Sequence, residues 1–282
     1  MILVFGKTGQ VARELAAYEE VTCLSRNEAD LTAPAACAAA IRTHAPAAVI
    51  NAAAYTAVDR AEAEEELATV INGSTPGVMA ETCAALGIPF VTLSTDYVFD
   101  GKGSSPWHPN EPVAPLNAYG RSKQVGEAAV RLAGGAYVIL RTSWVVSAHG
   151  NNFVKTMLRL GRSRDRMRVV ADQVGAPTPA RAIAKACIEI AQQLKSAPEK
   201  VGTYHFSGQP ETSWAEVAAE IFTEAAIPCA VAEIPSSAYP TAAPRPLNSR
   251  LDCSTLERAF GITRPDWQAG LKDILQDLGE RA

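Results

Sequence analysis

The feature that most constrains this 282-residue chain is a glycine-rich turn directly after its first apolar run. The run is Ile2–Phe5, and the next residues read Gly6-Lys-Thr-Gly9-Gln-Val-Ala12. Glycine lets the backbone turn sharply and approach a pyrophosphate, and a small third residue lets the following helix pack closely on the sheet. The helix N-terminus then offers free N–H groups to phosphate oxygens. The turn therefore predicts a dinucleotide-binding strand–turn–helix unit with Gly6 and Gly9 beside the phosphates.

Short apolar runs alternate with alanine-rich helical stretches through the first half of the chain. Continuous apolar strands separated by helices indicate a parallel sheet that is covered on both faces. We therefore expect an α/β fold with a doubly wound, Rossmann-like parallel sheet over residues 1–147. The expected strands are Ile2–Phe5, Val21–Leu24, Ala48–Asn51, 90–94 and 137–141, and the expected helices are 11–17, 34–43, 61–71 and 76–86.

The second half has longer loops that are richer in proline. A capping box of Ser213 and Glu216 predicts the start of an amphipathic helix that reaches residue 225. A final amphipathic helix is expected over 267–278. We interpret residues 148–282 as a smaller α/β substrate-binding lobe, and we expect a helix near 181–195 to return to the first domain as a cover.

Charge and composition exclude several classes of partner. The net charge of −4 argues against nucleic acid or an anionic membrane surface as the main partner. No apolar run reaches the roughly 18 residues that a membrane-spanning helix needs, and the chain starts directly as a strand without a leader pattern. We expect a cytoplasmic protein. The six cysteines form no CxxC pair and the four histidines show no ligand spacing, so neither disulfides nor a metal is predicted.

The end of the second strand bears on the choice of cofactor. An NAD-specific site usually places a carboxylate there, on the ribose hydroxyls. This chain instead has Leu24-Ser25-Arg26. Serine and arginine suit a 2′-phosphate, so we expect NADPH to be preferred over NADH, with Arg26 as a contact.

Tyr119-Gly-Arg-Ser-Lys123 is a Y-x-x-x-K motif. Positions i and i+4 share one face of a helix, so the phenol and the ammonium can point into the same pocket. A nearby ammonium stabilises phenolate and lowers the tyrosine pKa, which makes a general acid at neutral pH. Thr95 stands at the expected carboxyl end of the fourth strand, where it can hydrogen-bond a substrate carbonyl. The three residues predict a hydride-transfer site.

Six motifs in register carry a resemblance to a known family. Together they resemble the dTDP-4-dehydrorhamnose reductases, which are extended short-chain dehydrogenases/reductases, from residue 1 to about 267. The motifs begin at Gly6, Asn51 (Asn-Ala-Ala-Ala-Tyr-Thr-Ala-Val-Asp), Ser94 (Ser-Thr-Asp-Tyr-Val-Phe), Arg141 (Arg-Thr-Ser-Trp-Val), Gly150 (Gly-Asn-Asn-Phe) and Arg245 (Arg-Pro-Leu-Asn-Ser).

The resemblance implies reduction of the C4 ketone in dTDP-L-rhamnose biosynthesis, a supply route for cell-surface polysaccharide. It assigns Thr95, Tyr119 and Lys123 to catalysis. The other matched positions are Gly9, Gln10 and Val11 at the pyrophosphate, Asp30 and Leu31 near the adenine, Ala54, Tyr55 and Thr56 along the cofactor, Asp96 and Trp144 at the substrate, and Asn152, Arg245 and Asn248 at the nucleotide diphosphate. Ala12 replaces a common glycine, and Tyr55 replaces a common histidine.

Alternative functions remain open at this point. Related dehydratases carry Thr-Asp-Glu at the strand end, where this chain has Tyr97, and no proton-transfer pair for a 3,5-epimerase is placed here. A reductase of another nucleotide-linked 4-keto deoxysugar, or a non-catalytic reductase-like regulatory subunit, are the remaining candidates. We expect a monomer or homodimer with a small nucleotide-sugar substrate. Trp214 and Trp267 are interpreted as core anchors, and Asp273, Asp277 and Glu280 as solvated carboxylates.

Overall fold

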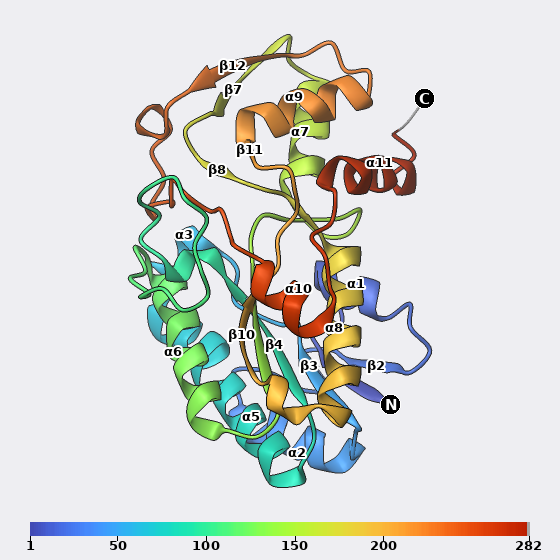
Figure 1. The fold of residues 1–282 in the computed structure, drawn as a ribbon. Coiled ribbons are helices and arrows are strands. Elements are labelled where there is room, and N and C mark those ends of the chain that lie inside the picture. The colour runs from blue at the N-terminus through green and yellow to red at the C-terminus, as the bar shows by residue number, and fades with distance from the viewer. Residues whose placement is uncertain (281–282) are drawn as a thin grey trace.

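The computed structural model describes residues 1–280, and its centre is a six-stranded sheet in which every neighbouring pair is parallel. The strand order is β10-β5-β4-β3-β1-β2. This arrangement confirms the predicted doubly wound α/β fold (Figure 1). The strands are β1 (Ile2–Phe5), β2 (Val21–Leu24), β3 (Ala48–Asn51), β4 (Phe90–Thr95), β5 (Tyr137–Thr142) and β10 (Gly202–His205).

Alternate side chains of strands β1–β5 enter two separate apolar cores, because successive residues of a strand point to opposite faces. Ile2 and Val4 pack with α1 (Gln10–Leu15), α8 (Ala180–Ser196) and α10 (Ser254–Phe260). Leu3 and Phe5 pack on the other face with α2 (Pro34–His44), α5 (Thr75–Leu86) and α6 (Ala118–Ala133). Figure 1 shows the two helical layers on either side of the sheet.

The strand order reverses between β1 and β3, since the chain runs from β1 to β2 on one side and returns to β3 on the other. Open parallel sheets bind ligands at the carboxyl ends of the strands beside such a reversal. The glycine-rich turn after β1 lies at this point. The topology therefore puts the predicted phosphate-binding turn where a ligand site is expected.

The second half builds its own apolar core above the carboxyl edge of the sheet (Figure 1). The helix that starts after Ser213 has the predicted capping box at its first turn, with both reciprocal hydrogen bonds present. The helices and strands of this region are α7 (Phe153–Gly161), α9 (Trp214–Glu224) and α11 (Trp267–Asp277), the parallel pairs β6 (Val145–Val146) with β9 (Thr178–Pro179) and β7 (Arg166–Val170) with β12 (Ala230–Ile234), the antiparallel pair β8 (Val174–Gly175) with β11 (Thr212–Ser213), and the short helices η3 (Pro198–Lys200) and η4 (Ser236–Ala238).

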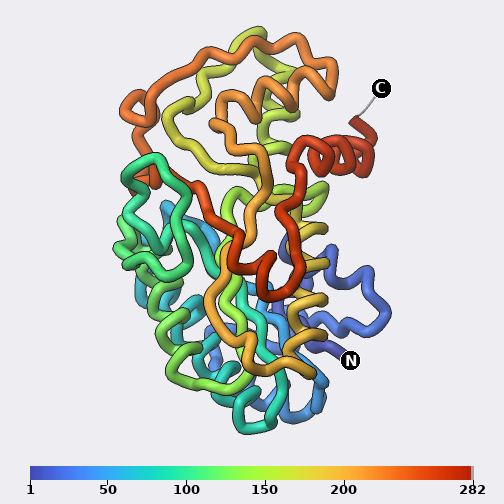
Figure 2. The backbone as a smooth tube through the Cα atoms, viewed as in Figure 1, coloured from blue at the N-terminus to red at the C-terminus, as the bar shows by residue number. Residues whose placement is uncertain are grey.

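Two parts of the fold differ from the sequence prediction. The helix expected over 61–71 is divided into α3 (Val58–Ala61), α4 (Glu65–Thr69) and a π-helix, η1 (Val70–Ser74), that continues into α5. The sheet also gains β10, which was not predicted. Figure 2 follows the chain back from the second half into α8 and β10. The division at residue 147 stays a prediction.

Among residues 1–280, no helix is both long and apolar enough to cross a membrane. Within the same residues, no group of His, Cys, Asp or Glu is arranged to hold a metal ion. Two of the carboxylates expected to be solvated form ion pairs with exposed arginines, Asp277 with Arg181 and Glu280 with Arg162. Trp267 is buried in the second core, and its indole N–H donates to the carbonyl of Pro210 at 2.9 Å.

Candidate active site

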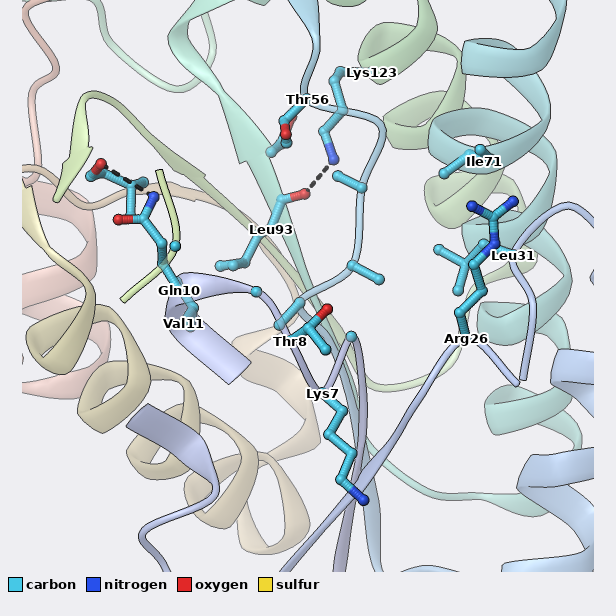
Figure 3. A pocket seen from close by; sticks show the side chains of 18 of the residues that line it. Lys7, Thr8, Gln10, Val11, Arg26, Leu31, Thr56, Ile71, Leu93 and Lys123 are labelled. Carbon is cyan, nitrogen blue, oxygen red and sulfur yellow. Dashed lines mark hydrogen bonds between the residues drawn. The ribbon is translucent and has the colours of Figure 1, made fainter. Parts of the chain in front are cut away.

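A cavity of about 560 Å³ opens at the carboxyl edge of the sheet. It runs between the turns that follow β1, β2 and β3 and the face of α6 (Figure 3). The residues expected along the cofactor line it, with the exception of Tyr55: they are Gly6, Gly9, Gln10, Val11, Arg26, Asp30, Leu31, Ala54, Thr56, Tyr119 and Lys123. The cavity also includes residues that the sequence analysis did not assign, namely Lys7, Thr8, Ala29, Ala52, Ala53, Ile71, Leu93, Ser94, Thr142, Val145, Gly150 and Asn151.

The turn after β1 requires glycine at its first position. Gly6 has a φ of +108°, and a Cβ there would lie 3.0 Å from three atoms of Ala53. Gly9 closes the turn by donating its N–H to the Gly6 carbonyl at 2.9 Å. Ala12 lies on α1 and is fully buried, so alanine satisfies the need for a small residue at this departure from the family pattern.

Gln10 connects the phosphate-binding turn to the second half of the chain. Its Nε2 donates to the carbonyl of Val145 at 3.4 Å, and its Oε1 accepts from Ser147 and Asn152 at 2.9 and 2.8 Å. The Asn152 amide also donates to the Ser147 carbonyl, and its oxygen caps α7 at Lys155. Asn152 does not line the cavity in this structure, and its amide has partners within the protein.

Two carboxylates in the loop after β2, Glu28 and Asp30, accept hydrogen bonds from Ser25 and Arg26. The Arg26 guanidinium lies 3.2 Å from Asp30, four residues later in the same loop, and 74% of its side chain is exposed. Ser25 donates both its backbone N–H and its hydroxyl to Glu28, at 2.8 and 2.7 Å. Only Arg26 and Asp30 of these four residues line the cavity. Both hydrogen-bonding groups of Ser25 thus serve Glu28, and Arg26 lines the cavity at this end, as does Lys7 of the turn after β1.

Tyr119 and Lys123 lie one turn apart on α6, as their spacing predicted. Asn117 starts the helix, since its Oδ1 accepts from the N–H of Gly120 at 2.8 Å. Lys123 is buried, and its Nζ donates to the carbonyl of Leu93 at 2.7 Å, which Figure 3 shows as a dashed line. The helix thus presents a phenol and an ammonium to one cavity.

The surroundings shift the pKa values of this pair in opposite directions. Burial raises the pKa of Tyr119 to about 12, and a hydrogen bond to Thr95 acts against that rise. Burial lowers the pKa of Lys123 to about 8, against the opposing charge of Glu127. We expected Lys123 to lower the Tyr119 pKa, but burial raises this pKa and the charge of Asp96 adds to the rise. Tyr119 is a neutral proton donor at physiological pH.

Thr95 ends β4 and starts the short helix η2 (Asp96–Val98). Its hydroxyl donates to Asp96 Oδ1 at 3.1 Å and accepts from the N–H of Tyr97 at 3.1 Å. Asp96 also accepts from the hydroxyl of Ser249 at 2.5 Å. Burial raises the pKa of Asp96 to about 6 despite these hydrogen bonds. Thr95 and Asp96 are both buried and both affect the pKa of Tyr119, although neither belongs to the cavity lining.

The remaining substrate residues lie beyond this cavity. Trp144 has a φ of +49°, which is uncommon for a bulky residue, and its ring stacks on Trp214 with centroids 3.7 Å apart. Arg245 pairs with Asp59 at 2.7 Å. Asn248 is buried, and its amide donates to backbone carbonyls of the loop at 102–105. In the structure, both Arg245 and Asn248 make polar contacts with other parts of the protein.

Tyr55 also lies outside the cavity lining. Its hydroxyl donates to Glu64 at 2.6 Å, and its backbone N–H donates to Asn72 Oδ1 at 2.8 Å. Asn72 belongs to the π-helix and in turn donates to Ser122 of α6 at 2.9 Å. Tyr55 therefore connects the segment after β3 to the helix that carries the phenol and the ammonium.

The sequence analysis missed a buried ion pair beside this site. Glu127 and Arg141 lie 2.6 Å apart and are 2% and 1% exposed. Glu127 stands eight residues after Tyr119, on the same helix face, and this spacing is the signal that points to it. Arg141 belongs to one of the quoted motifs but received no role there.

Comparisons with known proteins agree with this geometry. A family model described as the RmlD substrate binding domain matches residues 1–280. The dTDP-4-dehydrorhamnose reductase of Burkholderia thailandensis is 44% identical, with 98% of each chain covered. The solved structure of the Clostridium acetobutylicum dTDP-4-dehydrorhamnose reductase has a TM-score of 0.92 at 34% identity and 99% coverage of both chains. That of the Bacillus anthracis enzyme in complex with NADP has a TM-score of 0.90 at 33% identity and 98% coverage of both. This chain belongs to the dTDP-4-dehydrorhamnose reductase family.

Proposed function

We propose that this protein reduces the C4 ketone of dTDP-4-dehydro-L-rhamnose to dTDP-L-rhamnose, with NADPH as the preferred cofactor and NADH as the alternative. The observation that carries the proposal is that one cavity contains both the glycine-rich turn and the Tyr119–Lys123 pair. The names of its relatives and the NADP in the Bacillus anthracis enzyme support the same reaction. We further propose a cytoplasmic monomer or homodimer that acts on a dissolved nucleotide sugar.

The residues present fit a nicotinamide dinucleotide. Gly6 turns the backbone sharply at a φ of +108°, with no room for a Cβ beside Ala53, and a glycine turn of this kind lets backbone N–H groups approach a pyrophosphate. Arg26 lies at the opposite end of the cavity from Lys123 (Figure 3), which suits an adenosine 2′-phosphate and a nicotinamide ribose, respectively. When bound, the cofactor supplies the hydride that the ketone carbon accepts.

The chain's own groups handle the oxygen of the ketone. Tyr119, protonated at neutral pH, donates its phenolic proton to the developing alkoxide. The ammonium of Lys123 holds the ribose and stabilises the phenolate that remains. The Thr95 hydroxyl turns from Asp96 to the carbonyl oxygen and polarises it, while Ser249 still hydrogen-bonds Asp96.

The test measures NADPH oxidation by absorbance with dTDP-4-dehydrorhamnose and, in parallel, with a GDP-linked 4-keto sugar. We expect turnover with the dTDP substrate and a kcat/KM at least about tenfold lower with the GDP substrate, the ratio that one lost good contact produces. A preference for the GDP sugar would support the alternative reductase. Binding of NADPH without turnover of either sugar nucleotide would support the alternative of a non-catalytic regulatory subunit and would refute the proposed reaction.

A further inference from the structure

Three side chains on one face of α6 meet consecutive residues at the end of β4. They are Tyr119, Lys123 and Glu127, which are four residues apart and therefore share a helix face. Lys123 donates to the carbonyl of Leu93 at 2.7 Å. The next residue, Ser94, donates its hydroxyl to Glu127 at 2.7 Å. The end of β4 thus hydrogen-bonds both the ammonium of Lys123 and the carboxylate of Glu127, one turn further along α6.

Glu127 is fixed by more contacts than a helix-to-strand connection requires. Arg141 of β5 donates through Nε and Nη2 to its two oxygens, at 2.7 and 2.6 Å. Arg131, on the next turn of α6, donates at 2.8 Å. Burial raises the pKa of Glu127, but these partners outweigh it and leave the pKa below its usual value. A buried carboxylate that remains charged is therefore held at a fixed place behind Lys123.

Among the groups packed around Lys123 and Glu127, the negative charge that acts on Lys123 is that of Glu127. Burial lowers the pKa of His205 on β10 to about 3, so this ring is neutral where it faces Arg141 at a distance of 3.3 Å. Tyr119 is neutral as well. Arg131 and Arg141 are cations, and both are paired with Glu127. Burial opposes the charge of Lys123, and Glu127 is the group that favours it.

We propose that Glu127 is a positioning residue, whose buried charge, fixed by Arg141 and Ser94, keeps Lys123 as an ammonium against the carbonyl of Leu93. The inference rests on the proposed function, in which Lys123 must be charged to hold the ribose and to stabilise phenolate. A purely structural role, in which the Glu127–Arg141 pair only joins α6 to β5, predicts changes in stability. It predicts no change in the pH range of activity or of cofactor binding.

The Glu127→Gln variant separates the two roles. Glu127 lies one helical turn from Lys123, so loss of its charge should move the pH at which kcat/KM falls on the alkaline side down by about one to two pH units. In the wild type kcat/KM falls as pH rises through about 8, because Lys123 loses its proton there. Arg131→Gln is the matched control, because it removes an exposed partner of the same carboxylate, and we expect its kcat/KM to fall at nearly the same pH as that of the wild type.

A second comparison covers the case in which Glu127→Gln leaves Arg141 unpaired and fails to fold. Arg141→Gln is measured against the double variant Arg141→Gln/Glu127→Gln, and thermal unfolding verifies that both are folded. The two differ only in the charge at 127, and we expect kcat/KM to fall at a higher pH in the variant that keeps Glu127. The proposal is overturned if kcat/KM falls at the same pH in both members of every folded pair.

The dissociation constant of NADPH against pH, measured by fluorescence without any sugar nucleotide, gives an independent readout. We expect binding by Glu127→Gln to weaken at a lower pH than binding by the wild type. If the wild type fails to reduce the dTDP sugar while this difference remains, the proposed function fails and the positioning role stands. If the wild type turns over and the binding curves coincide, the positioning role fails and the function stands.

Discussion

Tyr119→Phe removes one hydroxyl from the cavity and tests the proposed proton donor. Because the pKa of Tyr119 is raised to about 12, the wild-type phenol is protonated throughout the working range. Removal of a general acid costs about two to four decades in kcat, which is roughly 2.7–5.4 kcal/mol of activation free energy. The ring keeps its packing. The free energy of unfolding should therefore fall by no more than about 0.5–1.5 kcal/mol, the range for one hydrogen bond.

The assay follows NADPH oxidation with saturating dTDP-4-dehydrorhamnose, together with NADPH affinity by fluorescence and thermal unfolding. Tyr97→Phe is the matched control, since its ring packs edge-on against Tyr119 with centroids 5.6 Å apart. We expect the control to stay within about threefold of the wild type in kcat, and both variants to bind NADPH normally. A Tyr119→Phe enzyme within about tenfold of the wild type would refute the role of Tyr119 as the acid.

Three further outcomes follow from the contacts described above. Thr95→Val should lower kcat/KM by at least about tenfold, whereas Thr95→Ser, which keeps the hydroxyl, should lower it less; equal losses would make Thr95 structural. Arg26→Ala should narrow the preference for NADPH over NADH by about two- to tenfold through KM, because the side chain is mostly exposed and shared with Asp30, and an unchanged ratio would remove Arg26 from the site. Gly126→Ala would put a Cβ 2.1 Å from the carbonyl of Asn72, so denaturant unfolding should report about 1–3 kcal/mol of destabilisation, and an unaltered midpoint would contradict that packing.

The strands of the sheet were predictable because they are short and continuously apolar. The bounds of Ile2–Phe5, Val21–Leu24 and Ala48–Asn51 were predicted without error. The first and third strands are buried on both faces and have no alternation to obscure them, whereas the second is a half-buried edge strand. The strand Gly202–His205 was missed because glycine, threonine and histidine resemble a loop, and only its pairing with β5 makes it a strand. The helix expected over 61–71 was wrong in its continuity, because hydrophobic spacing does not report a π-helical turn.

The cofactor side of the site was more predictable than the substrate side. Glycine at Gly6 and the four-residue spacing of Tyr119 and Lys123 are each constrained by backbone geometry, which sequence records directly. Asn152 and Asn248 were matched as diphosphate contacts, which stays a prediction, and in the structure their amides donate to protein carbonyls. An amide can serve either purpose, and sequence does not distinguish them.

A nascent chain that ends at residue 147 lacks both β10 and α8. The apolar side chains of Ile2, Val4 and Ile50, which pack in one core with α8, would then face water. Exposed apolar surface and unpaired strand edges make partly made chains prone to aggregation. The sheet is therefore completed only after residue 205 leaves the ribosome, and a gene cut between the two halves would not yield a stable amino-terminal fragment.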